Sequence, residues 1–560
     1  MQYLLPKKII SSSGNVANGD NLLSEKPLQI GLYEPLTAKI RGKAHIILDF
    51  GEELSGGARI LTFTANGDKR VRLRFGESIS ETCAEIGEKN ATNDHSLRDF
   101  TVELQNFSDM TFGQTGFRFL RLDFLGGDFE IKAVAAASDC TERETTGKFV
   151  SSDELLNDIW QAAAKTLKLC IRNGYLVDGI KRDRLVWIGD VYPEIKTAYC
   201  LFDDIPEIKN SLAFCRDQTP EGGWTNNIPS YSVWWLINLC EYYAHSGDDE
   251  FVKENSAFIS RLIGDVSACV DDDGNVNFDY FFIDWATHPE DKNRNEGEND
   301  IEERENDIEE LDIEERENAV KEYDEKAGTN YLLRIAFGRV IPLLKKFGMS
   351  FCEAEKTLEK LKRKSYSVKK YKQIAALGVI AGEKTRHNET VMLSGGAKGL
   401  STFLNYFIFS ALSQYNKIAE AVDMIKEYYG KMLELGATTF WEDFDAEWAK
   451  NSFGIDKLPV KGKSDIHGDF GRFCYKGFRH SLCHGWASGV LCYMTEELAG
   501  IKQTGFNEFS INPNLCGNLK SINCVYPTAF GKIEIYAEKS DDGSIKTKID
   551  APEQVKIIKN

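Results

Sequence analysis

The sequence lacks an excess of basic residues. It contains 68 Lys and Arg against 87 Asp and Glu, so its formal net charge is −19. Because a nucleic-acid backbone is bound by clustered Lys and Arg and repelled by a negative field, we expect no nucleic-acid partner. No stretch approaches the ~18 apolar residues of a membrane span, and no apolar run of signal-peptide length follows a basic start. We therefore expect a cytoplasmic protein, or one released without a recognisable signal, with no membrane partner.

The motifs of several cofactor-binding and catalytic classes are also missing. There is no Walker loop, no G-x-G-x-x-G after a strand, no G-x-S-x-G and no H-E-x-x-H. His480 and His484 lie at i, i+4 around Cys483, but no second pair of metal ligands follows them. The 13 cysteines are an odd number without a C-x-x-C pair, which is typical of free thiols in a reducing compartment. We expect neither a cofactor nor a metal.

The apolar pattern changes twice along the chain. Up to about Ala136 it has a period of two with Gly- and Asn-rich turns, which predicts antiparallel strands. From Ser152, expected to cap a helix, it becomes helical and pairs of helices follow. From Phe506 short strands return. The expected pairs are 232–244 with 250–270, 327–346 with 350–362, and 398–411 with 414–435, and the last helix is expected at 482–498.

These changes predict a multidomain α and β protein. Residues 146–502 are expected to form an (α/α)6 barrel, a toroid of helical hairpins, because five or six αα-hairpins of similar length exceed a four-helix bundle. Residues 1–145 are expected to form an N-terminal β-sandwich and residues 503–560 a small C-terminal β-sandwich. The sequence does not indicate an oligomeric state.

One acidic segment interrupts the helical region. Residues 296–325 contain 16 acids and 3 bases, and the heptapeptide DIEEREN occurs at 300–306 and again at 312–318. Its few apolar residues cannot offset the entropy of ordering it, so we expect a solvated loop or an exposed helix, with a partner-binding arm as the alternative. Without this insert 71 acids face 65 bases, a net charge of −6. The exclusion of nucleic acid then depends on the lack of a basic patch.

Four clusters of polar or aromatic residues are candidates for a functional site. Interleaved acids and arginines can hold one carboxyl at a chosen pKa, and aromatic walls suit the face of a sugar. Each cluster also has a structural interpretation: an ion-pair knot, a capping acid, or a buried core segment. The clusters are 177–190 with six charged residues and Trp187, 438–445 with Glu442 beside Trp441, 479–486 with His484, and the aromatic run 278–285 ending in Asp284 and Trp285.

At these clusters the sequence resembles glycoside hydrolase family 78, the bacterial α-L-rhamnosidases. The family pattern D-x-x-x-R-[DE]-x-x-x-W-x-G-D is similar to 178–190, with Asp178, Arg182, Asp183, Trp187 and Asp190 in the matching places. The family's T-x-W-E element resembles 439–442. Its R-S-x-x-H-x-W element resembles 479–486, with one residue inserted before the serine. The LDFGEELSGG stretch at 48–57 is similar to the family's N-terminal domain, so the likeness extends from about 48 to 536.

This resemblance implies hydrolysis of terminal α-L-rhamnosides with inversion of configuration. It places the general acid at Asp183 and the general base at Glu442, without a metal. The acid position is commonly Glu in the family, and Asp183 is one methylene shorter. Residues with an implied role in sugar binding are Asp178, Arg182, Trp187, Asp190, Trp285, Trp441 and His484.

The expected partner is a rhamnose-containing oligosaccharide or glycoside. The chain is short for the family and shows no extra carbohydrate-binding domains, which makes polymers less suitable. Two alternatives remain open: the same fold acting on another deoxy-sugar or a uronic-acid linkage, and a non-catalytic carbohydrate-binding protein that kept the pocket.

Overall fold

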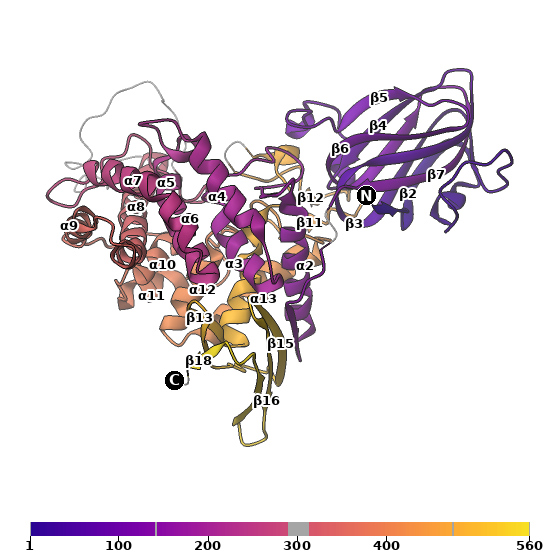
Figure 1. Ribbon diagram of the computed structural model, residues 1–560. Coiled ribbons are helices and arrows are strands. Elements are labelled where there is room, and N and C mark those ends of the chain that lie inside the picture. The colour runs from indigo at the N-terminus through magenta and orange to yellow at the C-terminus, as the bar shows by residue number, and fades with distance from the viewer. Residues whose placement is uncertain (1, 141–142, 289–312, 473–474, 559–560) are drawn as a thin grey trace.

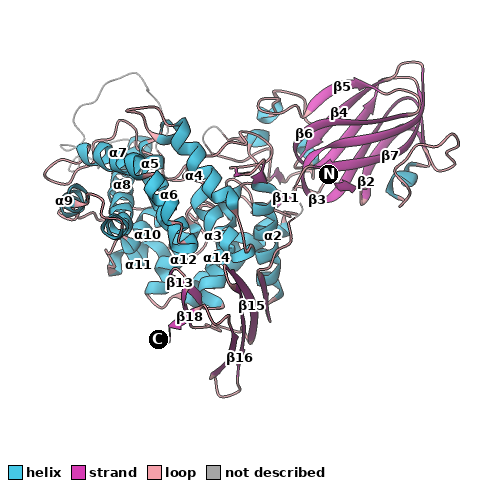
Figure 2. Cartoon of the chain, in the orientation of Figure 1, coloured by secondary structure: helices cyan, strands magenta, loops and turns pink. Residues whose placement is uncertain are grey.

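The computed structural model describes residues 2–140, 143–288, 313–472 and 475–558. A strand-rich N-terminal region lies beside a body of helices, and the C-terminal strands lie at another edge of that body (Figure 1). Figure 2 shows the same division by secondary structure. The predicted order of strands, then helices, then strands is therefore confirmed. The toroidal arrangement of the helices, the sandwich arrangement of the strands and the domain boundaries stay predictions.

The N-terminal region is one antiparallel sheet of seven strands. Its order is β1-β7-β3-β6-β4-β5, and β2 pairs with β3. Alternating apolar residues face an enclosed core, where the ring of Phe117 lies 5.0 Å from that of Phe75 and 5.6 Å from that of Phe50. The strands are β1 (Gln2–Leu4), β2 (Lys8–Ala17), β3 (Ala38–Asn66), β4 (Arg70–Gly76), β5 (Asp99–Glu103), β6 (Ser108–Phe124) and β7 (Asp128–Ser138), and the short helix α1 (Ile79–Cys83) follows β4.

The helical body contains helices in all three predicted pairs, but the helix predicted at 398–411 begins only at Asn405, and the one predicted at 250–270 is divided into two at Asn255. Its first helix is capped by Asp153, whose carboxylate accepts a hydrogen bond from the Leu156 N–H, so the predicted cap at Ser152 is one residue early. Proline at the first turn of α5 and Gly247 (φ 62°) after its last residue mark the two ends of that helix. The helices are α2 (Glu154–Cys170), α3 (Val191–Leu201), α4 (Pro206–Gln218), α5 (Pro229–Ser246), α6 (Asp249–Glu254), α7 (Ser256–Ala268), α8 (Ile313–Lys346), α9 (Cys352–Leu361), α10 (Lys372–Ile380), α11 (Arg386–Leu393), α12 (Asn405–Gln414), α13 (Ile418–Glu434) and α14 (Val490–Tyr493).

The C-terminal strands begin earlier than predicted and recruit a strand from before the helices. They start at Ile501 instead of Phe506, and β8 (Lys148–Ser151) pairs antiparallel with β15. Buried residues of these strands, such as Ile535, share one continuous apolar core with the helices. The strands are β13 (Ile501–Gly505), β14 (Glu508–Ile511), β15 (Ser521–Thr528), β16 (Gly531–Lys539), β17 (Ile545–Asp550) and β18 (Lys556–Ile558); the two-residue strands are β9 (Ile171–Arg172), β10 (Tyr175–Leu176), β11 (Ser452–Phe453) and β12 (Ser464–Asp465).

The predicted last helix, 482–498, is wrong in its first part. His484 has an extended backbone (φ −134°), and regular helix is limited to α14 between a 3-10 turn (Gly485–Gly489) and a π turn (Met494–Leu498). Hydrogen bonds to neighbouring segments hold residues 480–484 instead, because the His484 N–H donates to the Phe440 carbonyl at 3.0 Å. His480 and His484 therefore do not lie one helical turn apart.

The end of the acidic insert is also different from the prediction. Residues 296–312 lie outside the described residues, but 313–325 form the start of α8, where acidic side chains favour the positive end of the helix dipole. Asp324 and Glu325 are buried. The Asp324 carboxylate accepts hydrogen bonds from the backbone N–H groups of Lys369, Lys370 and Tyr371 at 2.8–3.1 Å. These hydrogen bonds explain the burial of Asp324, which composition alone did not predict.

Within the described ranges, no helix combines the length and the apolar character needed to cross a membrane.

Candidate active site

The loop between α2 and α3 carries the largest set of predicted site residues. Asp178 closes this loop, because its Oδ1 accepts a hydrogen bond from the Leu185 N–H at 2.7 Å and its own N–H donates to the Leu185 carbonyl. Asp183 and Arg184 lie at the turn with φ of 50° and 56°, a left-handed conformation that is uncommon for side chains of this size. The side chain of Asp183 is only 14% exposed.

Arg182 joins the two carboxylates to which the resemblance assigns catalysis. Its Nη1 lies 3.2 Å from Asp183 Oδ1, and its Nη2 lies 2.5 Å from Glu442 Oε1. Because the two Nη atoms of one guanidinium are about 2.3 Å apart, those two oxygens lie no more than about 8 Å from each other, which is compatible with the ~6.5–9.5 Å of inverting glycosidases. The ring of Tyr475 lies 3.9 Å from the guanidinium carbon and covers it.

Glu442 is held from the segment that contains His484. Its N–H donates to the Ser481 carbonyl, and the Ser481 N–H donates in turn to Glu442 Oε2, both at 3.0 Å. The Glu442 carbonyl accepts a hydrogen bond from the indole N–H of Trp486 at 2.9 Å. Glu442 is only 2% exposed, so neighbouring residues surround its side chain and hold it in position.

Three carboxyl groups lie around the imidazole of His484. Its Nε2 lies 3.7 Å from Glu442 Oε1, 3.9 Å from Asp190 Oδ2 and 4.0 Å from Asp178 Oδ2. Burial raises the pKa of Asp190 to about 8, although the Tyr231 hydroxyl, which donates to it at 2.7 Å, opposes this shift. Burial also raises the pKa of Asp178 well above its usual value, with the charge of Asp183 adding to the effect.

These pKa shifts determine which of the three side chains, Asp178, Asp190 and His484, can donate hydrogen bonds at neutral pH. Burial, together with the charge of Arg182, lowers the pKa of His484 well below its usual value, so its imidazole is neutral. With its pKa at about 8, Asp190 is mostly protonated at neutral pH and offers an O–H donor, and the raised pKa of Asp178 favours the same form. Such an arrangement can bind the hydroxyls of a neutral polar ligand, which both donate and accept hydrogen bonds.

A pocket lies beside Glu442. Trp285 forms one wall, and the ring of Trp486 stacks on that of Phe403 at 4.9 Å to form another. Asp284 also lines this pocket. Burial raises the pKa of its carboxyl group to about 6. The lining residues are Asp284, Trp285, Ser401, Thr402, Phe403, Glu442, Asp443, Arg472, Tyr475 and Trp486.

The structure thus brings together most of the predicted residues, and it adds some that the sequence did not indicate. Of the predicted site residues, Glu442 and Trp285 line this pocket. Trp187 packs on Tyr231 at 6.1 Å and Trp441 on Phe444 at 5.5 Å, away from the pocket lining. The predicted residues that lie around Arg182 and His484 but outside the lining are Asp178, Arg182, Asp183, Asp190 and His484. Trp486 belongs to a cluster that the sequence singled out, but only its stacking partner identifies it as a wall. Arg472 and Tyr475 carried no sequence signal.

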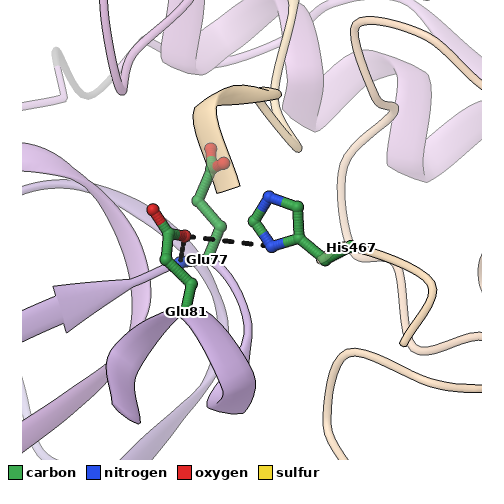
Figure 3. Close-up of side chains that lie close together, drawn as sticks. All are labelled: Glu77, Glu81 and His467. Carbon is green, nitrogen blue, oxygen red and sulfur yellow. Dashed lines mark hydrogen bonds and ion pairs between the residues drawn. The ribbon is translucent and has the colours of Figure 1, made fainter. Parts of the chain in front are cut away.

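One group of potential metal ligands lies outside this pocket. Among the described residues, Glu77, Glu81 and His467 come from two regions of the chain and lie close together, with potential ligand atoms within 4.8 Å of one another (Figure 3). The ammonium group of Lys181 lies 3.2 Å from Glu77 Oε2 and 2.9 Å from Glu81 Oε1. Because this ammonium already supplies the positive charge that a metal would bring, the group is best described as an internal ion cluster.

Residues 144–304 match the family model of the bacterial alpha-L-rhamnosidase 6 hairpin glycosidase domain. This match confirms the resemblance that the motif at 178–190 indicates. No curated protein matches the chain.

Solved structures share the fold. A family 78 rhamnosidase of Bacillus sp. GL1 has a TM-score of 0.73 at 18% identity, over 96% of this chain and 55% of its own. An alpha-L-rhamnosidase from Dictyoglumus thermophilum has a TM-score of 0.68 at 17% identity, over 98% and 57%. A rhamnosidase from Klebsiella oxytoca with rhamnose bound has a TM-score of 0.63 at 18% identity, over 82% and 88%. The chain spans little more than half the length of the first two proteins.

Proposed function

We propose that this protein is an inverting α-L-rhamnosidase that releases terminal L-rhamnose from oligosaccharides or glycosides. Asp183 acts as the general acid that protonates the leaving oxygen. Glu442 acts as the general base that activates a water on the opposite face of the ring. The sugar hydroxyls bind to the side chains of Asp178, Asp190 and His484.

The main support for this proposal is that Arg182 contacts both of the proposed catalytic carboxylates. Asp183 lies within the matched segment and Glu442 is far from it in the sequence, yet one guanidinium contacts both carboxylates next to an aromatic pocket. Two carboxylates in contact with one guanidinium, beside an aromatic wall for the sugar, supply the acid and the base that glycoside hydrolysis needs, and the upper limit of about 8 Å on their separation is compatible with inversion. The similar solved structures are those of rhamnosidases, which supports the same activity for this chain.

The charge of the pocket favours a neutral deoxy-sugar over a uronic acid. Three acids line it, Asp284, Glu442 and Asp443, and Arg472 pairs with acids of its own at 2.7 Å (Asp445) and 3.6 Å (Asp443). The carboxylate of a uronic acid would find no unpaired cation among these lining residues to bind it. The faces of Trp285, Phe403 and Trp486 provide apolar surface for the C6 methyl of rhamnose, a contact worth about 1–3 kcal/mol of discrimination.

A panel of aryl glycosides tests this proposal. We expect release of the aryl group from an aryl α-L-rhamnoside, and little from the corresponding α-L-fucoside or β-D-glucuronide. Asp183→Asn and Glu442→Gln each lower kcat by about 10²–10⁴-fold, which is the usual contribution of general acid–base catalysis. Asp217→Asn, a change of the same kind at a residue whose side chain is 61% exposed, serves as the control and leaves kcat unchanged.

Two outcomes would contradict the proposal. Normal turnover in Asp183→Asn or Glu442→Gln would remove that residue from its role. Binding of L-rhamnose by the wild type without product release from any aryl glycoside would favour the non-catalytic carbohydrate-binding protein.

A further inference from the structure

The N-terminal sheet reaches the segment that holds Glu442. Glu77 lies between β4 and α1, and its side chain is fully buried at the contact between the sheet and the helical body. Glu77 Oε2 accepts a hydrogen bond from the Leu482 N–H at 2.7 Å, and Oε1 accepts one from the Ser481 hydroxyl at 3.3 Å. The carboxylate therefore grips two successive residues of the 479–486 segment.

The same two residues determine where Glu442 lies. Ser481 exchanges two hydrogen bonds with Glu442, one through its carbonyl and one from its N–H to Glu442 Oε2. The Leu482 carbonyl accepts a hydrogen bond from the Thr439 hydroxyl at 2.8 Å, three residues before Glu442. A shift of Ser481 and Leu482 would consequently move the proposed base, and Glu77 is the side chain that holds them from behind.

We propose that Glu77 is a positioning residue for catalysis, which fixes Glu442 through Ser481 and Leu482. This inference rests on the proposed function, because it assigns a role to the contact between the N-terminal sheet and the proposed base. The sheet is then part of the catalytic apparatus, although Glu77 does not line the pocket.

The surroundings of Glu77 make its grip depend on pH. Burial raises the pKa of Glu77 to about 7; Lys181 opposes the rise and Glu81 adds to it. The other charged or titratable groups nearby are Glu53, whose pKa burial raises well above its usual value, His467, whose pKa burial lowers well below its usual value, and Arg98, which faces His467. Above pH 7 Glu77 is a charged acceptor, and such hydrogen bonds are about twice as strong as neutral ones.

Glu77→Gln separates positioning from a general effect on stability. A protonated Glu77 resembles glutamine, so the wild type and Glu77→Gln converge below the pKa and differ above it. On an aryl α-L-rhamnoside we expect the wild-type kcat to exceed that of Glu77→Gln at least tenfold at pH 8, and less than twofold at pH 5.5. KM changes less than twofold, because the pocket walls are not touched.

Glu53→Gln is the matched control. Glu53 is buried at the same contact, but its side chain holds neither Ser481 nor Leu482, while its N–H donates to the Thr438 hydroxyl at 2.8 Å. We expect kcat within twofold of the wild type from pH 5.5 to 8.5. A deficit of Glu77→Gln that is the same at every pH, or that Glu53→Gln shares, would overturn the proposal.

Two further measurements keep the test independent of one variant and of the reaction. Glu77→Asp keeps the charge but withdraws it by one methylene, so its kcat falls at all pH values; full activity would overturn the proposal. Hydrogen exchange of a peptide covering 478–486 at pH 8 needs no substrate, and we expect at least threefold faster exchange in Glu77→Gln but not in Glu53→Gln. Unchanged exchange would overturn the positioning role, whereas a wild type that releases no rhamnose would contradict only the proposed function.

Discussion

Replacing Asp324 by asparagine tests whether the end of the acidic insert is structural. The carboxylate accepts hydrogen bonds from three backbone N–H groups and is fully buried, although burial raises its pKa. Asparagine keeps one oxygen and points an N–H₂ group at the remaining donors, so one or two buried N–H groups lose their acceptor. At about 1–3 kcal/mol for each unpaired group, the expected loss is about 3 kcal/mol.

The melting temperature measures this loss. With an unfolding entropy of about 2.1 cal/mol/K for each residue of a helical region of roughly 350 residues, 3 kcal/mol corresponds to a drop of about 4 °C. Glu317→Gln is the matched control: Glu317 lies on the same helix and contacts Lys370 Nζ at 2.7 Å, but the pair is more than half exposed. Such a pair contributes at most about 1 kcal/mol. A drop below 1 °C for Asp324→Asn, or equal drops for both variants, would refute the reasoning.

Three further predictions concern the pocket and its acids. Trp285→Ala raises KM for an aryl α-L-rhamnoside about tenfold, because one aromatic wall is lost, and steady-state kinetics measure it. Asp284 has its pKa raised to about 6, so the folded state binds its proton more tightly and loses about 3 kcal/mol as pH rises from 4 to 6. Asp284→Asn therefore gains thermal stability relative to the wild type between pH 4.5 and 7.5, and an unchanged difference would contradict this. His95 Nδ1 lies 3.3 Å from Asp183 Oδ1, the proposed acid, so His95→Asn lowers kcat about fivefold. The reduction is larger for a substrate with a poor leaving group than for one with a good leaving group. Equal reductions for both substrates would show that His95 does not support acid catalysis.

The fold was predictable where periodicity carries the information. The change from a period of two to a helical period placed the first sheet and the paired helices, because amphipathic elements repeat their buried face regularly. The start of α8 was not predictable in this way: Asp324 and Glu325 are buried by hydrogen bonds to distant segments, and an acidic composition indicates the opposite. Residues 482–484 were wrongly predicted as helix, because the extended backbone of this segment depends on hydrogen bonds to residues distant in the sequence, such as that from the His484 N–H to the Phe440 carbonyl.

The site was predictable where a motif gathers several charged residues in one loop. Asp178, Arg182, Asp183 and Asp190 come from thirteen consecutive positions, so their proximity needed no tertiary information. The roles of Arg472 and Tyr475 as pocket walls depend on a loop far away in the sequence, and no pattern marks them. The contacts of Glu77 were not predictable either, because its hydrogen bonds to Ser481 and Leu482 join two regions that are far apart in the sequence.

The stereochemistry of the first product tests the central claim most directly. Hydrolysis of an aryl α-L-rhamnoside is followed by proton NMR before the released sugar equilibrates. An inverting pair, Asp183 as acid and Glu442 as base, produces β-L-rhamnose first, and the α anomer appears later by mutarotation. Initial release of α-L-rhamnose would contradict the account, because one of the two carboxylates would then have to attack the sugar directly.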